Sequence, residues 1–522
     1  MKTKITIIKK AICIWMIAFP FLANAQTRYL DNVFPSVTVT PNVLYGHNIT
    51  VLTGTPVDTT LLMDVYTPFG DTCTSRPVVI YLHAGTYLPI IYNRACVGTK
   101  SDSSVVEICK QFAKKGYVAI AMDYRLGWDA NAIGVNTDLV TGTLFQAAYR
   151  SIQDAKACVR FLKGNAPTYG IDTTKIALGG VGAGAITALN YIALHDTIQL
   201  WNQKLVCNCV TPTPPFTAGM PYIDFHTLGD FDGFGGVPQF NNPNNSVGHS
   251  SDVQMVFSIY GEIGDSTWIS TSFPPTVALH PRTPPTGGGP FHWGTLYAGN
   301  TGFPILPDVS GPHQYICDFN ANGVNNVFTN LPFSDPYSAR ANAINSGCEG
   351  LFPFETSGLY EDVWDWYDST TMCFVAQAIG LTCQDGLNAY YGSVATNPNM
   401  TKTQALAYID TIQNFLAPRL VRALHPDINN CSTVGIESPV LADESILLFP
   451  NPAHDKFSIS SKDPSANIRK VELLDVSGRL VFSKDNLKTN AYHFPGINLQ
   501  SGIYFVKIKF DSGEVIRKIT LQ

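Results

Sequence analysis

One predicted turn has the glycine spacing of a motif that carries a catalytic serine, but the serine is absent. It reads Gly180-Val181-Gly182-Ala183-Gly184. The spacing matches Gly-x-Ser-x-Gly, in which a serine stands on a sharp turn between a strand and a helix. The central position here is Gly182, which has no side chain that could attack a carbonyl carbon. Glycine adopts the strained backbone of such a turn at little cost, whereas a serine there stores about 1–3 kcal/mol.

A second pattern suggests a cation site built from oxygen ligands. Asp318, Asn320 and Asn322 carry side-chain oxygens at alternate positions, and Gly323 follows where a calcium loop makes its sharp turn. The position of the closing acid holds Thr329 instead. Two interpretations stay open, a calcium site and a polar turn without a ligand, and the sequence predicts no other cofactor.

The elements around these residues alternate between strands and helices. The predicted buried strands are the apolar runs 77–82, 116–122 and 175–178. Residues 145–165, 185–193 and 402–424 have helical spacing. Such alternation predicts an α/β fold with a mostly parallel sheet flanked by helices. Residues 45–66 alternate apolar and polar side chains, as antiparallel strands do.

Two stretches, 210–250 and 270–315, are rich in proline and glycine and are expected to form long irregular loops. Apart from the strand expected at 276–280, little in them is periodic. Loops of this length in a compact domain usually carry function.

Several motifs follow one another in a recognisable order. They are Tyr81-Leu82-His83-Ala84-Gly85, Asp123-Tyr124-Arg125-Leu126, Gln153-Asp154-Ala155, Tyr169-Gly170-Ile171-Asp172 and the glycine turn at 180–184. In this order and spacing, residues 77–200 resemble the carboxylesterase branch of the α/β-hydrolase fold. The resemblance implies ester hydrolysis by relatives, and it places His83, Ala84 and Gly85 where relatives have their oxyanion loop.

The same resemblance locates the acid that would assist a catalytic serine. Its position falls on or near Pro284, and no aspartate or glutamate occurs between Ser266 and Leu306. The nearest carboxylates are Glu262, Asp265 and Asp308. His280 and the His292-Trp293 pair could line a site, although lone histidines in loops are more often solvated.

The histidine of relatives follows a later strand and precedes the final helix, predicted at 402–424. The chain has no histidine between His313 and His425. A triad acts only as one unit of nucleophile, base and acid. Because the serine, the acid and the histidine are all missing where relatives have them, the sequence predicts a pseudoenzyme. Some adhesion relatives of cholinesterases also carry glycine at this turn and act by binding.

The C-terminal segment has its own set of motifs. They are Phe449-Pro450-Asn451-Pro452, Asp475-Val476-Ser477-Gly478-Arg479, Leu499-Gln500-Ser501-Gly502-Ile503-Tyr504 and Lys518-Ile519-Thr520-Leu521. Residues 446–522 thereby resemble the type A sorting domain of the type IX secretion system of Bacteroidota. The resemblance implies a small antiparallel sandwich that engages the secretion machinery and is then removed or attached to the surface.

The N-terminus and the composition fit an exported protein. Four lysines within residues 1–10 precede an apolar run at 11–22 and the small residues Ala23-Asn24-Ala25. This pattern predicts a signal peptide over 1–25. The expected order is then a hydrolase-like domain over 26–431, a linker at 432–445 and the sorting domain. No further segment predicts a membrane span, and a net charge of -6 gives no reason to expect nucleic acid as a partner.

Export makes disulfides possible, and eleven of the 12 cysteines lie beyond the predicted signal peptide. We expect some disulfides and some buried thiols, with the pairing open. Cys207-Asn208-Cys209 is too tight for a zinc site without a second pair nearby.

Two functions remain from the sequence. The first is a catalytically silent hydrolase-fold protein, secreted or held at the surface, that binds an ester-like ligand or a protein partner. The second is an active carboxyl-ester hydrolase with relocated catalytic residues, which would need a serine or cysteine close in space to His425 or His313.

Overall fold

The computed structural model describes residues 27–521 with internal gaps. The gaps are 53, 210–214, 245–247, 283–289, 299–302, 330–332, 356–364, 399–400, 426–445, 455, 462–466, 476–478, 497–498 and 511–512. The predicted signal peptide and the predicted linker therefore lie outside the described residues. The chain divides into two compact units, one of residues 1–69, 77–165 and 173–426 and the other of 70–76, 166–172 and 427–522.

The first unit is built on an eight-stranded sheet in the order β1-β2-β4-β3-β5-β6-β7-β10. Its strands are β1 (Val37–Thr50), β2 (Val57–Pro68), β3 (Arg76–Leu82), β4 (Val118–Met122), β5 (Ile171–Val181), β6 (Met255–Ile259), β7 (Thr276–Pro281) and β10 (Leu351–Phe354). β1 pairs antiparallel with β2, and β2 with β4, whereas the other recorded pairs are parallel. The predicted mostly parallel sheet is confirmed.

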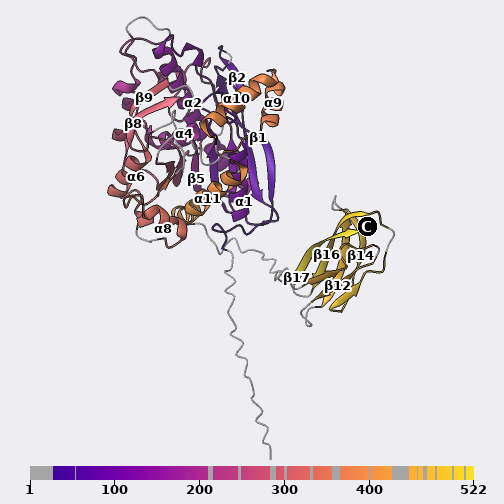
Figure 1. Ribbon diagram of the computed structural model, residues 1–522. Helices are drawn as coiled ribbons and strands as arrows, with labels where there is room; N and C mark the ends of the chain where they lie inside the picture. The colour runs from indigo at the N-terminus through magenta and orange to yellow at the C-terminus, as the bar shows by residue number, and fades with distance from the viewer. Residues whose placement is uncertain are drawn as a thin grey trace, which may run out of the picture. The chain divides into compact units, whose positions relative to one another are not determined.

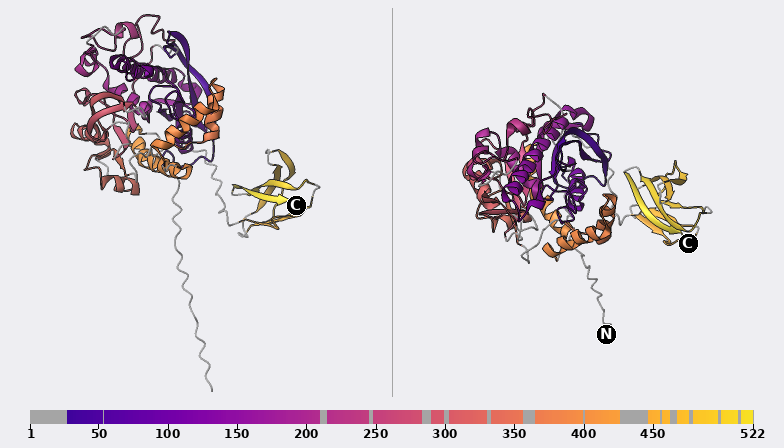
Figure 2. Two further views of the ribbon diagram at one scale, coloured as in Figure 1. Left: turned by 45° about the horizontal axis from the view of Figure 1, so that its top comes forward. Right: turned by 90° about the horizontal axis from the view of Figure 1, so that it is seen from above.

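Complete burial explains why the central strands are apolar runs. Every residue of β3, β4, β6 and β7 is buried, as expected for parallel strands covered on both faces. Figures 1 and 2 show the helices of this unit gathered around its sheet. Helices α1 (Ser103–Lys115) and α11 (Lys402–Leu424) share one apolar core with β6 and β7.

The opposite face is covered by α2 (Thr137–Gly164), α4 (Ala183–Ala193) and α6 (Pro312–Ala321). The remaining α-helices of the described residues are α3 (Ala166–Tyr169), α5 (Phe225–Leu228), α7 (Asn326–Thr329), α8 (Pro336–Asn342), α9 (Ser369–Ala378) and α10 (Cys383–Thr396). The final helix agrees with the sequence prediction at both ends.

One expected loop contains regular structure. Within 270–315 the chain forms, besides β7, the antiparallel pair β8 (Trp293–Ala298) and β9 (Phe303–Ser310). Pro304 and Pro307 lie within β9, and proline is tolerated there because the two-stranded pair leaves an edge free of ladder bonds. The prolines hid this strand from a sequence pattern that treats them as breakers.

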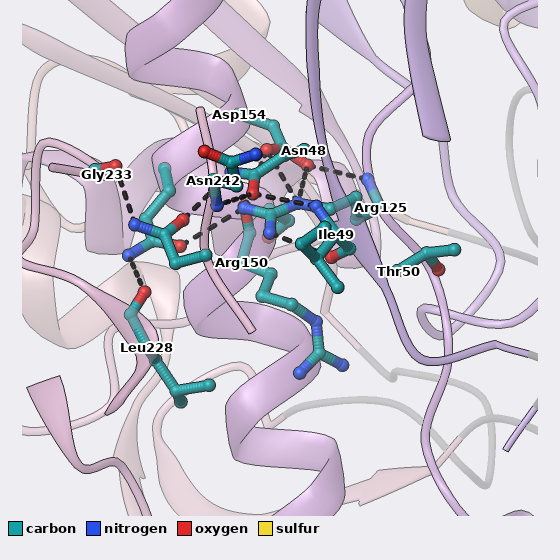
Figure 3. A network of polar contacts seen from close by, with 12 residues as sticks. Asn48, Ile49, Thr50, Arg125, Arg150, Asp154, Leu228, Gly233 and Asn242 are labelled. Carbon is teal, nitrogen blue, oxygen red and sulfur yellow. Dashed lines mark hydrogen bonds and ion pairs between the residues drawn. The ribbon is translucent and has the colours of Figure 1, made fainter. Parts of the chain in front are cut away.

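A buried polar network ties the first strands to α2. Arg125, just after β4, donates to both carboxylate oxygens of Asp154 in α2 through Nε at 2.9 and 3.0 Å. Its Nη1 donates to the Ile49 carbonyl at the end of β1. Figure 3 shows how Asn48 extends this network toward Asn242 in the 210–250 loop. The motif residues Arg125 and Asp154 therefore hold the fold together.

The second unit consists of strands in two antiparallel sheets, of orders β11-β12-β15 and β14-β13-β16-β17. The strands are β11 (Ile446–Phe449), β12 (Ser458–Ser461), β13 (Ile468–Asp475), β14 (Leu480–Lys484), β15 (Ala491–His493), β16 (Gly502–Phe510) and β17 (Gly513–Leu521). Buried side chains such as Ile459, Val471 and Val506 form its own core. The predicted all-β sandwich is confirmed.

Candidate functional site

Gly182 stands at the junction of β5 and α4 in the backbone conformation expected of a nucleophile turn. Its φ is 53° and its ψ is -118°, a left-handed region that side chains rarely adopt. Its amide donates to the Ile259 carbonyl at the end of β6. A Cβ built on Gly182 would lie 3.5 Å from the Cβ of Ala84, which is ordinary contact. The turn has kept its shape and the room for a side chain.

The flanking glycines are fixed by close packing. A Cβ on Gly180 would lie 2.6 Å from the Leu82 carbonyl oxygen, and one on Gly184 would overlap the same atom. The residues between them, Val181 and Ala183, are buried. The loop after β3 therefore presses against this turn, as the oxyanion-loop assignment requires.

His83 in that loop is enclosed by its neighbours. Its ring stacks on Tyr124 with centroids 4.3 Å apart, and the Tyr124 hydroxyl donates to the His83 carbonyl. Burial lowers the pKa of His83, opposed by Asp123, whose Oδ1 lies 3.7 Å from Nε2. The imidazole is thus biased toward its neutral form and braces the loop that also contains Ala84 and Gly85.

The two strand ends that would carry the acid and the base hold an ion pair at the surface. Arg282 follows β7 and Glu355 follows β10, and their Nη1 and Oε1 atoms are 2.9 Å apart. Both side chains are about half exposed, at 50% and 53%. Pro284 lies outside the described residues, as does 356–364, whose sequence contains no histidine.

The histidines named in the sequence are placed apart from these positions. His313 is at the start of α6, with its ring 4.4 Å from that of exposed His292. His425 caps the end of α11 in a left-handed conformation and is exposed.

The structure brings together a histidine and a carboxylate that the sequence analysis considered separately, His280 and Glu262. Glu262, just beyond β6, and His280, within β7, are both buried, with Oε1 and Nε2 3.5 Å apart. The ends of adjacent parallel strands share one edge of a sheet. Glu262 and His280 each lie at or just beyond the carboxyl end of their strand. The sequence could therefore have predicted that they lie near each other, had β6 and β7 been recognised as neighbours.

An apolar cavity of about 120 Å³ lies beside the glycine turn. Its lining includes Ala183 and Ile186 of α4, Phe145 of α2, Leu306 of β9 and, as the one carboxylate among the described residues that line it, Glu262. The β8–β9 pair, which the sequence did not predict, supplies part of the wall. The arrangement offers a partly open, mostly apolar ligand site without a nucleophile at the turn.

The calcium candidates do not form a loop. Asp318 and Asn320 lie within α6, and Asn322 caps its end. Residues two apart on a helix point in different directions, so the helix does not aim these oxygens at one point. The Asn320 amide instead donates to the carbonyls of Ile316 and Glu349.

Cysteines form disulfides rather than metal sites in the described part of the chain. The pairs there are Cys207–Cys209, Cys317–Cys348 and Cys373–Cys383, and the thiols are Cys96, Cys109 and Cys158. Two groups have closely spaced potential metal ligands, but each depends on cysteines that are already bridged. Disulfides together with buried thiols were expected.

Comparison with known proteins gives two family matches. Residues 63–280 match the BD-FAE family model, and residues 447–522 match the model described as a secretion system C-terminal sorting domain. No curated protein matches the chain.

Solved structures of an esterase from Thermogutta terrifontis are also similar. Its native form is 16% identical to this chain, and the match covers 48% of this chain and 72% of the esterase, with a TM-score of 0.27. Its propionate-bound form is also 16% identical, and the match covers 49% of this chain and 75% of the esterase, with a TM-score of 0.28. The butyrate-bound form is 17% identical, covers 45% and 70%, and gives 0.26.

The two family matches agree with the architecture of the two units. Within the described residues, every helix is too short or too polar to cross a membrane. The chain carries an esterase-like α/β-hydrolase domain matching the BD-FAE family, followed by a type IX secretion sorting domain that directs it to the cell surface or the exterior.

Proposed function

We propose that this protein is an exported, catalytically silent member of the α/β-hydrolase fold that binds a ligand in the cavity beside Gly182. The observation that carries the proposal is the turn itself, which keeps the backbone of a nucleophile elbow at φ 53° with no side chain on it. A reaction that needs a serine there has no atom to begin with.

The strand ends support the same conclusion. Arg282 and Glu355 directly follow the two strands after which relatives are expected to carry the acid and the base, and they pair with each other at the surface. An exposed arginine cannot orient a histidine as a buried carboxylate does. The cavity, in contrast, is lined mostly by apolar side chains, which is what a binding protein needs from this fold.

The test is hydrolysis of p-nitrophenyl acetate by the purified protein, alongside Gly182→Ser and Gly182→Ala. We expect no turnover above the buffer rate from any of the three. The alanine variant is the matched control, because both substitutions carry the same backbone strain and only one adds a hydroxyl. Turnover by the natural chain would refute the silent assignment.

A second candidate, an active ester hydrolase with relocated residues, is favoured by the Glu262–His280 pair. A cysteine also lies beside His313, with Cys317 Sγ 3.9 Å from its Nδ1, but Cys317 is bridged to Cys348 and is therefore not a free thiol. The Glu262–His280 pair would need a serine or cysteine within hydrogen-bond reach of His280 Nε2, and this atom has no such partner among the described residues. If the natural chain or Gly182→Ser proves active, His280→Gln should abolish that activity. Persistent activity in His280→Gln would exclude this pair as its source.

A further inference from the structure

One residue that lines the apolar cavity is a glutamate whose carboxylate accepts no hydrogen bond from the described residues. Glu262 is 2% exposed and lines the cavity. Its Oε1 has no hydrogen bond, and no described residue donates one to its Oε2. Buried acceptors almost always have a partner, and no described residue supplies one, so this carboxylate is free to accept from a ligand.

Other polar groups on the wall are occupied by the protein. The Tyr87 hydroxyl donates to the Ala183 carbonyl at 2.9 Å, and the Thr187 hydroxyl donates to the same oxygen at 2.8 Å. The amide of Asn190 donates to the Glu262 carbonyl, and its oxygen accepts from the Gly264 amide. These groups brace the wall and do not compete with Glu262 for a ligand.

The neighbouring histidine determines what kind of donor fits. His280 Nδ1 lies 2.7 Å from the Pro281 carbonyl, which can only accept, so Nδ1 carries a proton. Nε2 of a neutral ring would then face Glu262 Oε1 lone pair to lone pair at 3.5 Å. Neither atom makes a hydrogen bond within the described residues, and a bond between them would need one further proton, on the histidine or on the carboxyl group.

The ligand meets the same acceptor with or without that proton. Oε1 is the oxygen that faces Nε2, so Oε2 remains an acceptor in either case. A group that can only accept, such as an ether, gains nothing there, and a carboxylate would meet another oxygen acceptor. A hydroxyl donor fits.

We propose that the cavity binds a small uncharged amphiphile whose apolar body fills the space between α2, α4 and β9 and whose hydroxyl donates to Glu262 Oε2. This rests on the proposed function, because it names the ligand class of the same cavity. The volume of about 120 Å³ is close to that of an engineered apolar cavity, about 150 Å³, that holds benzene. A body of about six carbons is therefore the matching size.

The experiment is an NMR titration of the full mature chain with three probes that share one ring. The probes are cyclohexanol, cyclohexyl methyl ether and cyclohexanecarboxylate. We expect cyclohexanol to bind about tenfold more tightly than the ether, since a hydrogen bond to a charged group is worth about one decade in Kd. We expect the carboxylate to bind more weakly than either.

Two variants connect the preference to the residue. Glu262→Leu should remove the difference between the alcohol and the ether, and Glu355→Gln, at an exposed glutamate, should leave it unchanged. If Glu262→Leu fails to fold, the three probes on the natural chain still decide the question.

The outcomes separate this inference from the proposed function. Equal binding of alcohol and ether, or tightest binding of the carboxylate, would overturn the inference while leaving a ligand-binding cavity in place. No binding of any probe would count against both.

Discussion

Two buried pairs of ionisable side chains in the same unit, Arg125–Asp154 and Glu262–His280, differ in how many hydrogen bonds they make. Arg125 and Asp154 are almost fully enclosed, and both carboxylate oxygens accept from the arginine, whose amide also donates to Oδ2 at 2.8 Å. Figure 3 shows the remaining contacts of this network, to Ile49, Arg150 and their neighbours. Nothing in this pair is left for a ligand.

Glu262 and His280 are equally buried but are poor in partners. Their closest approach is 3.5 Å, and Oε1 and Nε2 make no hydrogen bond within the described residues. The first pair joins strands and helix, whereas the second lines a cavity. The difference indicates that a buried pair whose hydrogen bonds are all made within the protein stabilises the fold. A buried pair with unused hydrogen-bonding atoms is available to a ligand.

The largest expected effect comes from breaking the saturated pair. Asp154→Asn replaces an acceptor of charge-assisted bonds and leaves the Arg125 guanidinium buried without its counter-charge. We expect the free energy of unfolding to fall by about 3–5 kcal/mol, measured by urea denaturation.

The matched control is Asp58→Asn. Asp58 pairs with His47 at 3.2 Å but is 61% exposed, so its loss should cost less than about 1 kcal/mol. If Asp154→Asn lowered the free energy of unfolding as little as the control does, a full set of hydrogen bonds would not identify the pairs that stabilise the fold.

An intermediate effect is expected at Asp365, a buried carboxyl with few donors. Burial raises the pKa of Asp365 to about 6, against opposing hydrogen bonds from Ser104. Asp102, whose pKa burial and Asp365 also raise, is its acidic neighbour. Between the unfolded pKa of about 3.9 and the folded one, the native state holds more protons than the unfolded state. Stability should therefore fall as the pH rises through this range.

Asp365→Asn removes that decline. We expect the variant to gain on the order of 2 kcal/mol over the natural chain at about pH 7.5 and much less at about pH 4.5, measured by urea denaturation at both pH values. Asp58→Asn, which removes a carboxylate that is 61% exposed, is the control at the same two pH values. An equal difference at both pH values would show that Asp365 titrates normally.

The sequence anticipated the parts of this comparison that depend on local pattern. The apolar runs became buried strands, the glycine turn adopted its elbow, and Arg125 and Asp154 lay within recognised motifs. The Glu262–His280 contact depends on the register of β6 against β7, in which Ile259 is opposite Leu279. The sequence could place both residues at one edge of the sheet, but it does not reveal the register that sets the distance between them. The cavity wall was missed for a different reason, because prolines concealed β9.

The smallest effect on stability is expected from the unsaturated pair. Glu262→Gln keeps the shape of the side chain and removes one charge, and its amide can donate to Nε2 of a neutral His280. No buried charge is left without a partner, in contrast to Asp154→Asn. We therefore expect the free energy of unfolding to change by less than about 1 kcal/mol, with Glu355→Gln as the exposed control in the same urea series. A loss as large as that of Asp154→Asn would show that Glu262 and His280 hold the fold, and the contrast between the two pairs would no longer separate structure from function.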